Sequence, residues 1–250
     1  MEDYKELYDK ASSVIGWDFS DIRKRLKTEG RKWNYIELVK TYGNRDSFLL
    51  DIGTGGGELL LEVANYFRKA YGIDVSPKMI KTANKNLKES KVSNVEFSVA
   101  DSKKIPFKDE YFDIVICRHA PFYAKEVFRV LKPKGIFITQ QVAENDKINI
   151  KKVFERGQSY GEEPGTLMNK YVKELKEAGF RIIREDKFNI IEYYIPGDLV
   201  FLLKNTPIVD GIDIKKDYLL LEKLEREHNV GDRIKTNASR SLIICKKVSI

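Results

Sequence analysis

Residues 48–61 read Phe-Leu-Leu-Asp-Ile-Gly-Thr-Gly-Gly-Gly-Glu-Leu-Leu-Leu, and they predict a strand, a glycine turn and a helix in that order. The apolar run from Phe48 to Ile52 has the length and composition of a buried strand. Four of the next five residues are glycine. Apolar residues then recur at helical spacing from Leu59 to Phe67. Because glycine permits positive φ and close approach of a ligand, we expect this turn, with the free N–H groups that open the helix, to face a bound molecule.

The spacing of the glycines separates the classes of ligand. A dinucleotide fingerprint, Gly-x-Gly-x-x-Gly, would need its last glycine at position 58, which is Glu58. A phosphate-binding P-loop needs Gly-Lys-Ser/Thr, and no Lys occurs between positions 53 and 67. The remaining pattern is Asp-x-Gly-x-Gly-x-Gly, which begins at Asp51. A carboxylate beside the loop and no cation for phosphates suit a ligand that has an amino group and no pyrophosphate.

Length and composition suit one large α/β domain, or one domain with a cap, because the chain has 250 residues and a hydrophobic share of 42%. The sequence shows neither a signal peptide nor an apolar run of membrane length, so we expect a cytoplasmic protein with no membrane partner. Two cysteines and two histidines are widely scattered, which predicts no metal site. The net charge of +7 permits RNA as a partner without requiring it, because charges of both signs are interleaved.

A second strand is predicted at residues 70–75, with Asp74 near its end. Asp74 follows Asp51 by 23 residues, about the length of a strand–helix–strand unit. An acid at this position can accept hydrogen bonds from both ribose hydroxyls of a nucleoside. The alternative role, a helix N-cap, is better filled by Ser76, because Pro77 suits the first helical position. We therefore assign Asp74 to a ribose.

Acidic residues recur after the following strand as well. Residues 95–99 alternate like a third strand and lead into Asp101, which either accepts from an adenine amino group or closes a turn. The recurrence of acids after successive strands favours adenine. Met79, on the predicted helix after the second strand, either packs against adenine or belongs to the core. A fourth apolar strand leads to Arg118, and because parallel strands bind ligands beyond their carboxyl ends, this tip should face the same crevice.

The remaining strands are predicted from further apolar segments. A turn at residues 132–135 leads into a fifth strand at 136–139. Two extended segments are predicted at 180–184 and 188–194, and a last strand is predicted at 240–248.

Together these features resemble the class I S-adenosylmethionine-dependent methyltransferases. The words Phe-Asp-Ile-Val at 112–115 and Glu-Val-Phe-Arg-Val-Leu-Lys-Pro-Lys-Gly at 126–135 resemble the small methyltransferases often called type 11, although Lys134 stands where that family usually has Gly. The resemblance covers roughly residues 45–145. It implies an α/β, doubly wound, Rossmann-like fold with a mostly parallel seven-stranded sheet and an antiparallel last strand.

The resemblance also implies S-adenosyl-L-methionine as the cofactor and extends the set of binding residues. The predicted cofactor-binding residues are Asp51, Gly53, Thr54, Gly55, Gly57, Asp74, Val75, Met79, Asp101, Ser102 and Arg118. His119 is the best candidate for a general base because imidazole titrates near neutrality. A hydrogen-bonding role toward backbone or cofactor is its alternative. Tyr123 is the second catalytic candidate, as a group that orients or deprotonates an acceptor.

Two additions lie outside the minimal cofactor core and are predicted to carry substrate choice. In one methyltransferase domain of 1–250, residues 1–46 form an N-terminal helical cap and residues 196–236 form a cap insertion near the C-terminus. The cofactor-binding core then comprises 47–195 and 237–250.

Four residues are candidates for the substrate pocket. Trp17 and Trp33 either form a pocket wall, as the resemblance implies, or pin the N-terminal extension to the core through their large apolar area. Phe122 follows the fourth strand, and Gln141 follows the fifth. Both are expected to face the crevice.

The predicted activity is methyl transfer from a sulfonium to an oxygen or nitrogen atom of a small molecule. The cofactor carries the chemistry, and the protein supplies alignment and exclusion of water. Two alternatives stay open. One is an RNA methyltransferase, supported only by the net charge and the basic run between residues 23 and 32. The other is a regulatory protein that binds the cofactor without catalysis.

Overall fold

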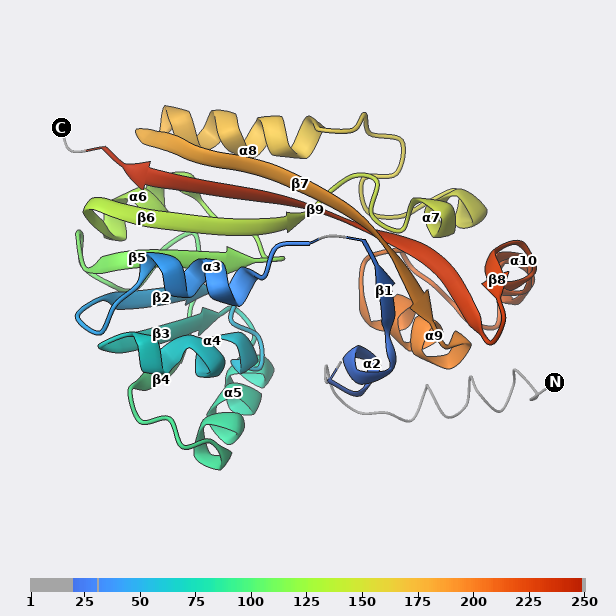
Figure 1. Cartoon of the computed structure of the whole chain (residues 1–250), viewed down its shortest axis with the longest axis horizontal. Helices are drawn as coiled ribbons and strands as arrows, with labels where there is room; N and C mark the ends of the chain where they lie inside the picture. Colours follow the sequence, from blue (N-terminus) through green and yellow to red (C-terminus); the bar gives the residue numbers. More distant parts are fainter. Residues whose placement is uncertain (1–19, 31, 249–250) are drawn as a thin grey trace. The chain divides into compact units, whose positions relative to one another are not determined.

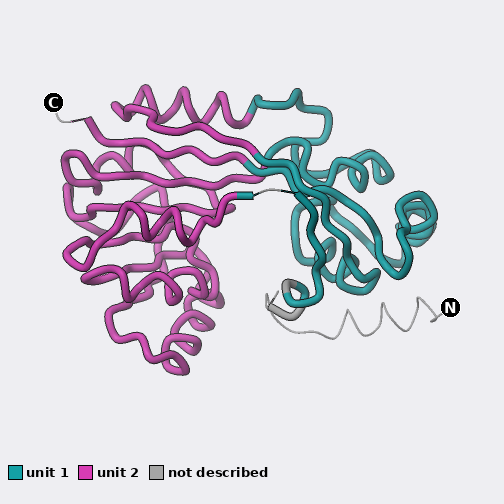
Figure 2. Tube along the Cα trace, in the orientation of Figure 1, with its two compact units in different colours: residues 1–32, 143–166, 188–240 teal, residues 33–142, 167–187, 241–250 magenta. Residues whose placement is uncertain are grey.

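The computed structural model describes residues 20–30 and 32–248, and the chain separates into two compact units (Figures 1 and 2). Unit 1 comprises residues 1–32, 143–166 and 188–240, and unit 2 comprises residues 33–142, 167–187 and 241–250. The strands predicted at 48–52, 70–75 and 95–99 and the glycine turn at 53–57 all belong to unit 2. Trp17, predicted for the substrate pocket, lies outside the described residues.

The parallel part of the sheet belongs to unit 2. Its strands are β2 (Phe48–Ile52), β3 (Lys69–Asp74), β4 (Val95–Val99), β5 (Phe112–Arg118) and β6 (Leu131–Val142). They lie in the order β6-β5-β2-β3-β4, and each neighbouring pair is parallel. The strand order reverses between β2 and β5, which makes their carboxyl ends the topological switch point where such sheets bind ligands.

Two long strands, β7 (Phe180–Tyr194) and β9 (Arg233–Lys247), contribute residues to both units. They extend the order to β7-β9-β6, which completes the seven strands expected from the sequence. The predicted Rossmann-like α/β fold is thus confirmed. Two short strands add to it: β1 (Lys27–Glu29) pairs antiparallel with β7, and β8 (Asn229–Val230) pairs antiparallel with β9.

Helices cover both faces of the unit 2 sheet, because alternate residues of each strand point to opposite sides. On one face, Leu50 belongs to a core cluster with the helices α6 (Ala124–Val130) and α8 (Thr166–Glu177). On the other, Leu49 belongs to a cluster with α3 (Tyr35–Tyr42) and α4 (Glu58–Val63).

The helices that follow β2 and β3 differ in how they begin and end. Helix α4 stops earlier than its apolar spacing predicts, because the chain tightens into the 3-10 turn η1 (Ala64–Tyr66) before β3. Helix α5 (Pro77–Glu89) begins as predicted: Ser76 is its N-cap, and the Ser76 hydroxyl accepts from the Met79 N–H at 3.3 Å. Asp74 is therefore not needed as the cap.

Unit 1 is built on the remaining helices, α2 (Ser20–Arg25), α7 (Ile148–Phe154), α9 (Pro196–Asn205) and α10 (Tyr218–His228). Leu199 and Leu203 of α9 are buried in one cluster with Leu221 and Leu224 of α10 and Phe154 of α7. The residues predicted as a cap insertion supply α9, α10 and β8, and unit 1 also takes residues 143–166 and 188–195.

Three predicted boundaries differ from the structure because strands run further than their apolar segments. The predicted turn at 132–135 lies within β6, where the pairing with β5 shifts register between Phe112 and Ile114 and so accommodates the proline of this segment. The predicted separate segments at 180–184 and 188–194 form the single strand β7, whose middle residues are mostly exposed. Strand β9 begins at Arg233 rather than at the predicted residue 240.

Candidate functional site

The predicted cofactor-binding residues lie at the carboxyl ends of four adjacent strands of unit 2. The glycine loop after β2 is held over the tip of β3, because the N–H groups of Gly53 and Thr54 both donate to the Ile73 carbonyl, at 2.9 and 3.0 Å. The loop then closes a turn in which the Gly57 N–H donates to the Thr54 carbonyl at 3.0 Å.

Gly53, Gly55 and Gly57 of this loop have positive φ, and their surroundings differ. A Cβ on Gly53 would lie 2.2 Å from the Ala120 Cβ, and a Cβ on Gly57 would lie 2.5 Å from the Phe97 ring. A Cβ on Gly55 would meet no atom within 4 Å. Gly53 and Gly57 are therefore required, because no side chain fits at either position. Gly55 borders open space, where a ligand can approach the backbone.

Asp74 lies beside this open space, and its carboxylate is held by two backbone donors. One oxygen, Oδ2, accepts from the Gly55 N–H at 3.0 Å, and the other, Oδ1, accepts from the Ser76 N–H at 2.9 Å. The side chain is half-buried. Because a carboxylate oxygen accepts more than one hydrogen bond, both oxygens keep capacity for a ligand while their orientation is fixed.

The neighbouring strand tips carry exposed apolar side chains. Asp74 pairs with Val99 in the ladder between β3 and β4. Val75, the next residue after Asp74, is 70% exposed and Val99 is 51% exposed. Met79 and Ser102 are half-buried. An acid next to exposed apolar surface suits a ligand that combines hydroxyl groups with a flat apolar ring.

Asp101 is exposed after β4 and closes a turn. Its Oδ1 accepts from the Lys103 N–H at 2.8 Å, and its carbonyl accepts from the Lys104 N–H at 3.0 Å. The turn-forming role considered for this residue is thus present. A carboxylate in such a turn still has acceptor capacity, so the contact with adenine stays a prediction.

Asp51 is a buried acid of the site, because only 4% of its surface is exposed. Burial raises the pKa of Asp51 to about 7, and the nearby Thr54 hydroxyl and Arg118 guanidinium act against this rise in pKa. Arg118 is exposed at the end of β5, and its guanidinium carbon lies 5.9 Å from the centre of the Tyr35 ring. A buried carboxyl at this position favours a cationic group nearby, because a cation compensates the cost of ionising it.

His119 directly follows β5 and is fixed by Gln140 at two points. Its N–H donates to the Gln140 carbonyl at 2.9 Å, and its ring Nε2 lies 2.9 Å from the Gln140 Nε2. The Gln140 Oε1 in turn accepts from the Trp33 indole N–H at 2.6 Å. His119 is exposed and has a φ of 56°, which is unusual for a residue with a side chain. The predicted residues His119 and Trp33 are thus connected through Gln140.

Gln140 has a weak signal in the sequence. It is a buried polar residue near the carboxyl end of β6, directly after the apolar run of that strand and Thr139, and it is 4% exposed. Its neighbour Gln141 was predicted for the substrate pocket, but the Gln141 amide donates to the Ala120 carbonyl and the Thr139 hydroxyl, both at 2.9 Å. Of two adjacent glutamines, only the fold shows which one reaches His119.

Phe122 and Tyr123 diverge after the same strand. Phe122 is 7% exposed and lies within the core. The centre of its ring is 4.9 Å from the centre of the Phe137 ring and 5.3 Å from the centre of the Tyr171 ring. Tyr123 precedes α6 and is 40% exposed, with the Lys103 Nζ 5.6 Å from its ring centre. Both residues also border a pocket of about 440 Å³ on the side of α6 and α8.

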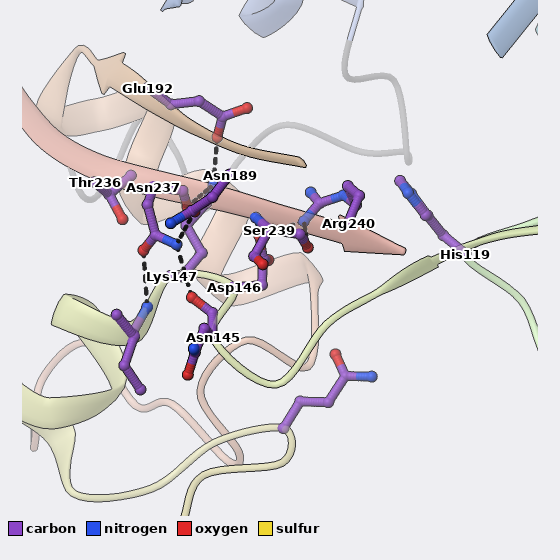
Figure 3. Close-up of polar contacts among 12 residues, drawn as sticks. His119, Asn145, Asp146, Lys147, Asn189, Glu192, Thr236, Asn237, Ser239 and Arg240 are labelled. Carbon is purple, nitrogen blue, oxygen red and sulfur yellow. Dashed lines mark hydrogen bonds and ion pairs between the residues drawn. The ribbon is translucent and has the colours of Figure 1, made fainter. Parts of the chain in front are cut away.

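A second polar cluster, which the sequence did not predict, lies in unit 1 around Asn237 (Figure 3). The Asn237 amide donates to the Asn145 carbonyl at 2.7 Å and to the Asn189 Oδ1 at 3.0 Å. Its Oδ1 accepts from the Ile148 N–H at 3.1 Å. The amide therefore joins three segments of unit 1 that are distant in sequence.

Two buried ion pairs adjoin Asn237. Lys147, which is 1% exposed, pairs with Glu192 and donates to the Asn237 carbonyl at 3.0 Å (Figure 3). Asp146 pairs with Arg240 and accepts from the Ser239 N–H at 2.8 Å. Because these groups are mutually satisfied, the cluster has the properties of a structural network.

Residues 20–30 and 32–248 contain no group of three or more His, Cys, Asp or Glu side chains that is arranged to hold a metal ion. Within the same residues, no helix combines the length and apolar character of a membrane span.

Comparison with known proteins identifies the family. The family model described as "Methyltransferase domain" matches residues 44–187, more than half of the chain. The chain is 35% identical over 109 residues to the uncharacterized methyltransferase YcgJ of Bacillus subtilis, covering 40% of this chain and 43% of that protein. It is 31% identical over 138 residues to the demethylmenaquinone methyltransferase of Lactococcus lactis, covering 51% of each. The chain thus spans about half the length of these relatives.

Solved structures agree in fold. A putative methyltransferase from Bacillus halodurans superposes with a TM-score of 0.64 at 20% identity, covering 86% of this chain and 98% of that one. This likeness concerns the fold alone. Together with the family match and the strand order β7-β9-β6-β5-β2-β3-β4, it confirms the resemblance seen in the sequence: the chain belongs to the methyltransferase domain family, as a class I S-adenosylmethionine-dependent methyltransferase.

Proposed function

We propose that the protein transfers a methyl group from S-adenosyl-L-methionine to an oxygen or nitrogen atom of a small-molecule acceptor. The observation that carries this proposal is the Asp74 carboxylate, held by the Gly55 and Ser76 N–H groups beside the open space at Gly55. Ribose hydroxyls are natural donors to a carboxylate in that orientation. The nearby exposed Val75 offers apolar area for an adenine ring.

The other predicted residues fit the remaining parts of the cofactor. Asp101 and Ser102 would contact the polar edge of adenine. Asp51 would stabilise the ammonium group of the amino-acid end, because a cation offsets the unfavourable ionisation of a buried carboxyl. Arg118 would meet the carboxylate at the same end. When bound, the cofactor supplies a methyl group on a sulfonium, and the protein's task is to hold and orient the two reactants and exclude water.

A small-molecule acceptor is favoured over RNA by the relatives. The Lactococcus lactis relative is named for demethylmenaquinone, a small molecule, and it is matched over 51% of its length. The match covers only about half of that relative, so its acceptor is not carried over. RNA has only the net charge of +7 and the basic run in its favour. The acceptor atom stays a proposal.

The test measures the contribution of each end of the cofactor to binding separately. Binding of S-adenosylhomocysteine and of methylthioadenosine, which has the nucleoside but no amino acid, is measured by calorimetry for three variants. Asp74→Ala should weaken both ligands about 10- to 150-fold, the equivalent of one charge-assisted hydrogen bond of about 1.5–3 kcal/mol. Asp51→Asn should weaken S-adenosylhomocysteine alone, because methylthioadenosine has no ammonium group.

Glu89→Ala serves as the matched control, since Glu89 is an exposed acid at the far end of α5, 3.8 Å from Lys85. It should leave both affinities unchanged. Circular dichroism confirms that each variant is folded. Unchanged affinity in folded Asp74→Ala, or an equal loss for both ligands in Asp51→Asn, would contradict the assignment of these residues.

A further inference from the structure

We propose that Gln140 is a positioning residue that fixes the tautomer of His119, so that the neutral ring accepts at Nε2 and carries its proton on Nδ1. In this state the ring carries an N–H donor at Nδ1, and it can act as a base only by giving up the hydrogen bond from Gln140. The tautomer follows from geometry within unit 2, and only its use toward an acceptor rests on the proposed function.

The orientation of the Gln140 amide is set by Trp33. An indole N–H is a donor only, so the Gln140 atom that lies 2.6 Å from the Trp33 Nε1 must be the amide oxygen. The amide NH2 group therefore faces His119. Because the Gln140 side chain is 4% exposed, the opposite orientation would place two donors against each other in a buried position.

The protonation of the ring follows from that orientation. The amide NH2 group is a donor only, so the His119 Nε2 at 2.9 Å must act as the acceptor. A neutral imidazole has one acceptor nitrogen and one N–H group. With Nε2 as the acceptor, the proton resides on Nδ1.

The main chain reinforces this arrangement. The His119 N–H donates to the Gln140 carbonyl at 2.9 Å, and the His119 backbone has a φ of 56°. Strained backbone of this kind persists where surrounding contacts define it, and it is common at functional sites. Gln140 thus holds both the backbone and the ring of the same residue.

The consequence concerns proton transfer. To act as a general base, His119 would have to accept a proton at Nε2 and lose the hydrogen bond from Gln140. This geometry therefore favours a hydrogen-bonding role for His119 over the role of general base. A donor at Nδ1 suits an acceptor whose oxygen is already ionised, such as a phenolate or carboxylate, because methylation of that oxygen releases no proton.

Long-range ¹H–¹⁵N correlation spectra of the imidazole rings test the tautomer directly. The chain has two histidines, so His228→Gln identifies the His119 signals. The expected spectrum shows Nε2 unprotonated and Nδ1 protonated. In Gln140→Glu, one carboxylate oxygen still accepts from Trp33 and the other now accepts from His119. Nε2 should therefore become protonated, either in the other neutral tautomer or in the imidazolium that a neighbouring carboxylate stabilises.

Two further variants complete the design. Gln158→Glu makes the same charge change at an exposed position of unit 1 and should leave the His119 pattern unchanged. Gln140→Met removes both hydrogen bonds and should shift His119 toward the tautomer mixture of free imidazole, which tests the idea even if Gln140→Glu does not fold. A wild-type His119 protonated on Nε2, or a pattern indifferent to both Gln140 variants, overturns the proposal. These spectra need no cofactor, so failure of the methyltransferase proposal would be seen separately.

Discussion

Replacing Asp51 with Asn should stabilise the folded protein, and the gain should grow as the pH rises from 5 to 8. Asp51 is 4% exposed at the end of β2, and burial raises the pKa of its carboxyl to about 7. At neutral pH the native state must therefore either hold a proton on this carboxyl or bury a charge. Asparagine keeps the shape of the side chain and removes the ionisation.

The magnitude follows from proton linkage. The carboxyl has a pKa of about 7 when folded and an ordinary value of 3.8 when unfolded. Between these values the native state binds more protons than the unfolded state, so the free energy of unfolding of the wild type falls as pH rises and levels off above pH 7. At about 1.36 kcal/mol per pKa unit, the destabilisation is about 1.7 kcal/mol at pH 5 and about 4 kcal/mol at pH 8.

The assay is urea unfolding of wild type and Asp51→Asn at pH 5 and pH 8, in matched buffers. The difference in free energy of unfolding between the two proteins should rise by roughly 2.5 kcal/mol from the lower to the higher pH. Asp46→Asn, at an exposed acid, provides the control for removing a carboxylate in general. A difference that is the same at both pH values, or larger at pH 5, would refute the buried, destabilised carboxyl.

Other predictions concern packing in each unit. Gly57→Ala should lower the free energy of unfolding by about 2–4 kcal/mol in urea titrations, because its Cβ would lie 2.5 Å from the Phe97 ring and φ is positive. Gly55→Ala should lower the free energy of unfolding by only about 1–2 kcal/mol. It should nevertheless weaken the binding of S-adenosylhomocysteine in calorimetry, because the added methyl group occupies the open space. Equal losses of stability in Gly55→Ala and Gly57→Ala would contradict this distinction. Glu192→Ala should destabilise by about 3–5 kcal/mol in the same urea assay, because it leaves Lys147 buried without its counter-charge, and a loss below 1 kcal/mol would show that Lys147 finds solvent.

Local signals in the sequence predicted the elements that local physics determines. The strand Phe48–Ile52 and the Ser76 cap with Pro77 at the first helical position are as expected, because each depends on a few consecutive residues. Strand β7 was divided in two, because its charged middle resembles a loop when the neighbouring strand is unknown. The residue types of a strand alone do not show which neighbouring strand pairs with it.

The candidate site was predictable to the level of strand tips. Asp74 lies at the end of β3, as predicted, and its contact with a ribose stays a prediction. Phe122 and Gln141 were placed at the correct tips, but beyond a strand no periodicity fixes the direction of a side chain, and both turn toward neighbouring parts of unit 2. The contacts of Gln140 and Asn237 depend on segments distant in sequence, which only the folded chain brings together.

The central claim is that the crevice at the tips of β2, β3 and β4 binds an adenosyl sulfonium. Calorimetric titration of the full chain with S-adenosylmethionine, S-adenosylhomocysteine, NAD and ATP tests it most directly. We expect the first two compounds to bind at one site per chain and the two pyrophosphate-bearing nucleotides to give no heat of binding. Binding of NAD or ATP without binding of S-adenosylmethionine would contradict the account.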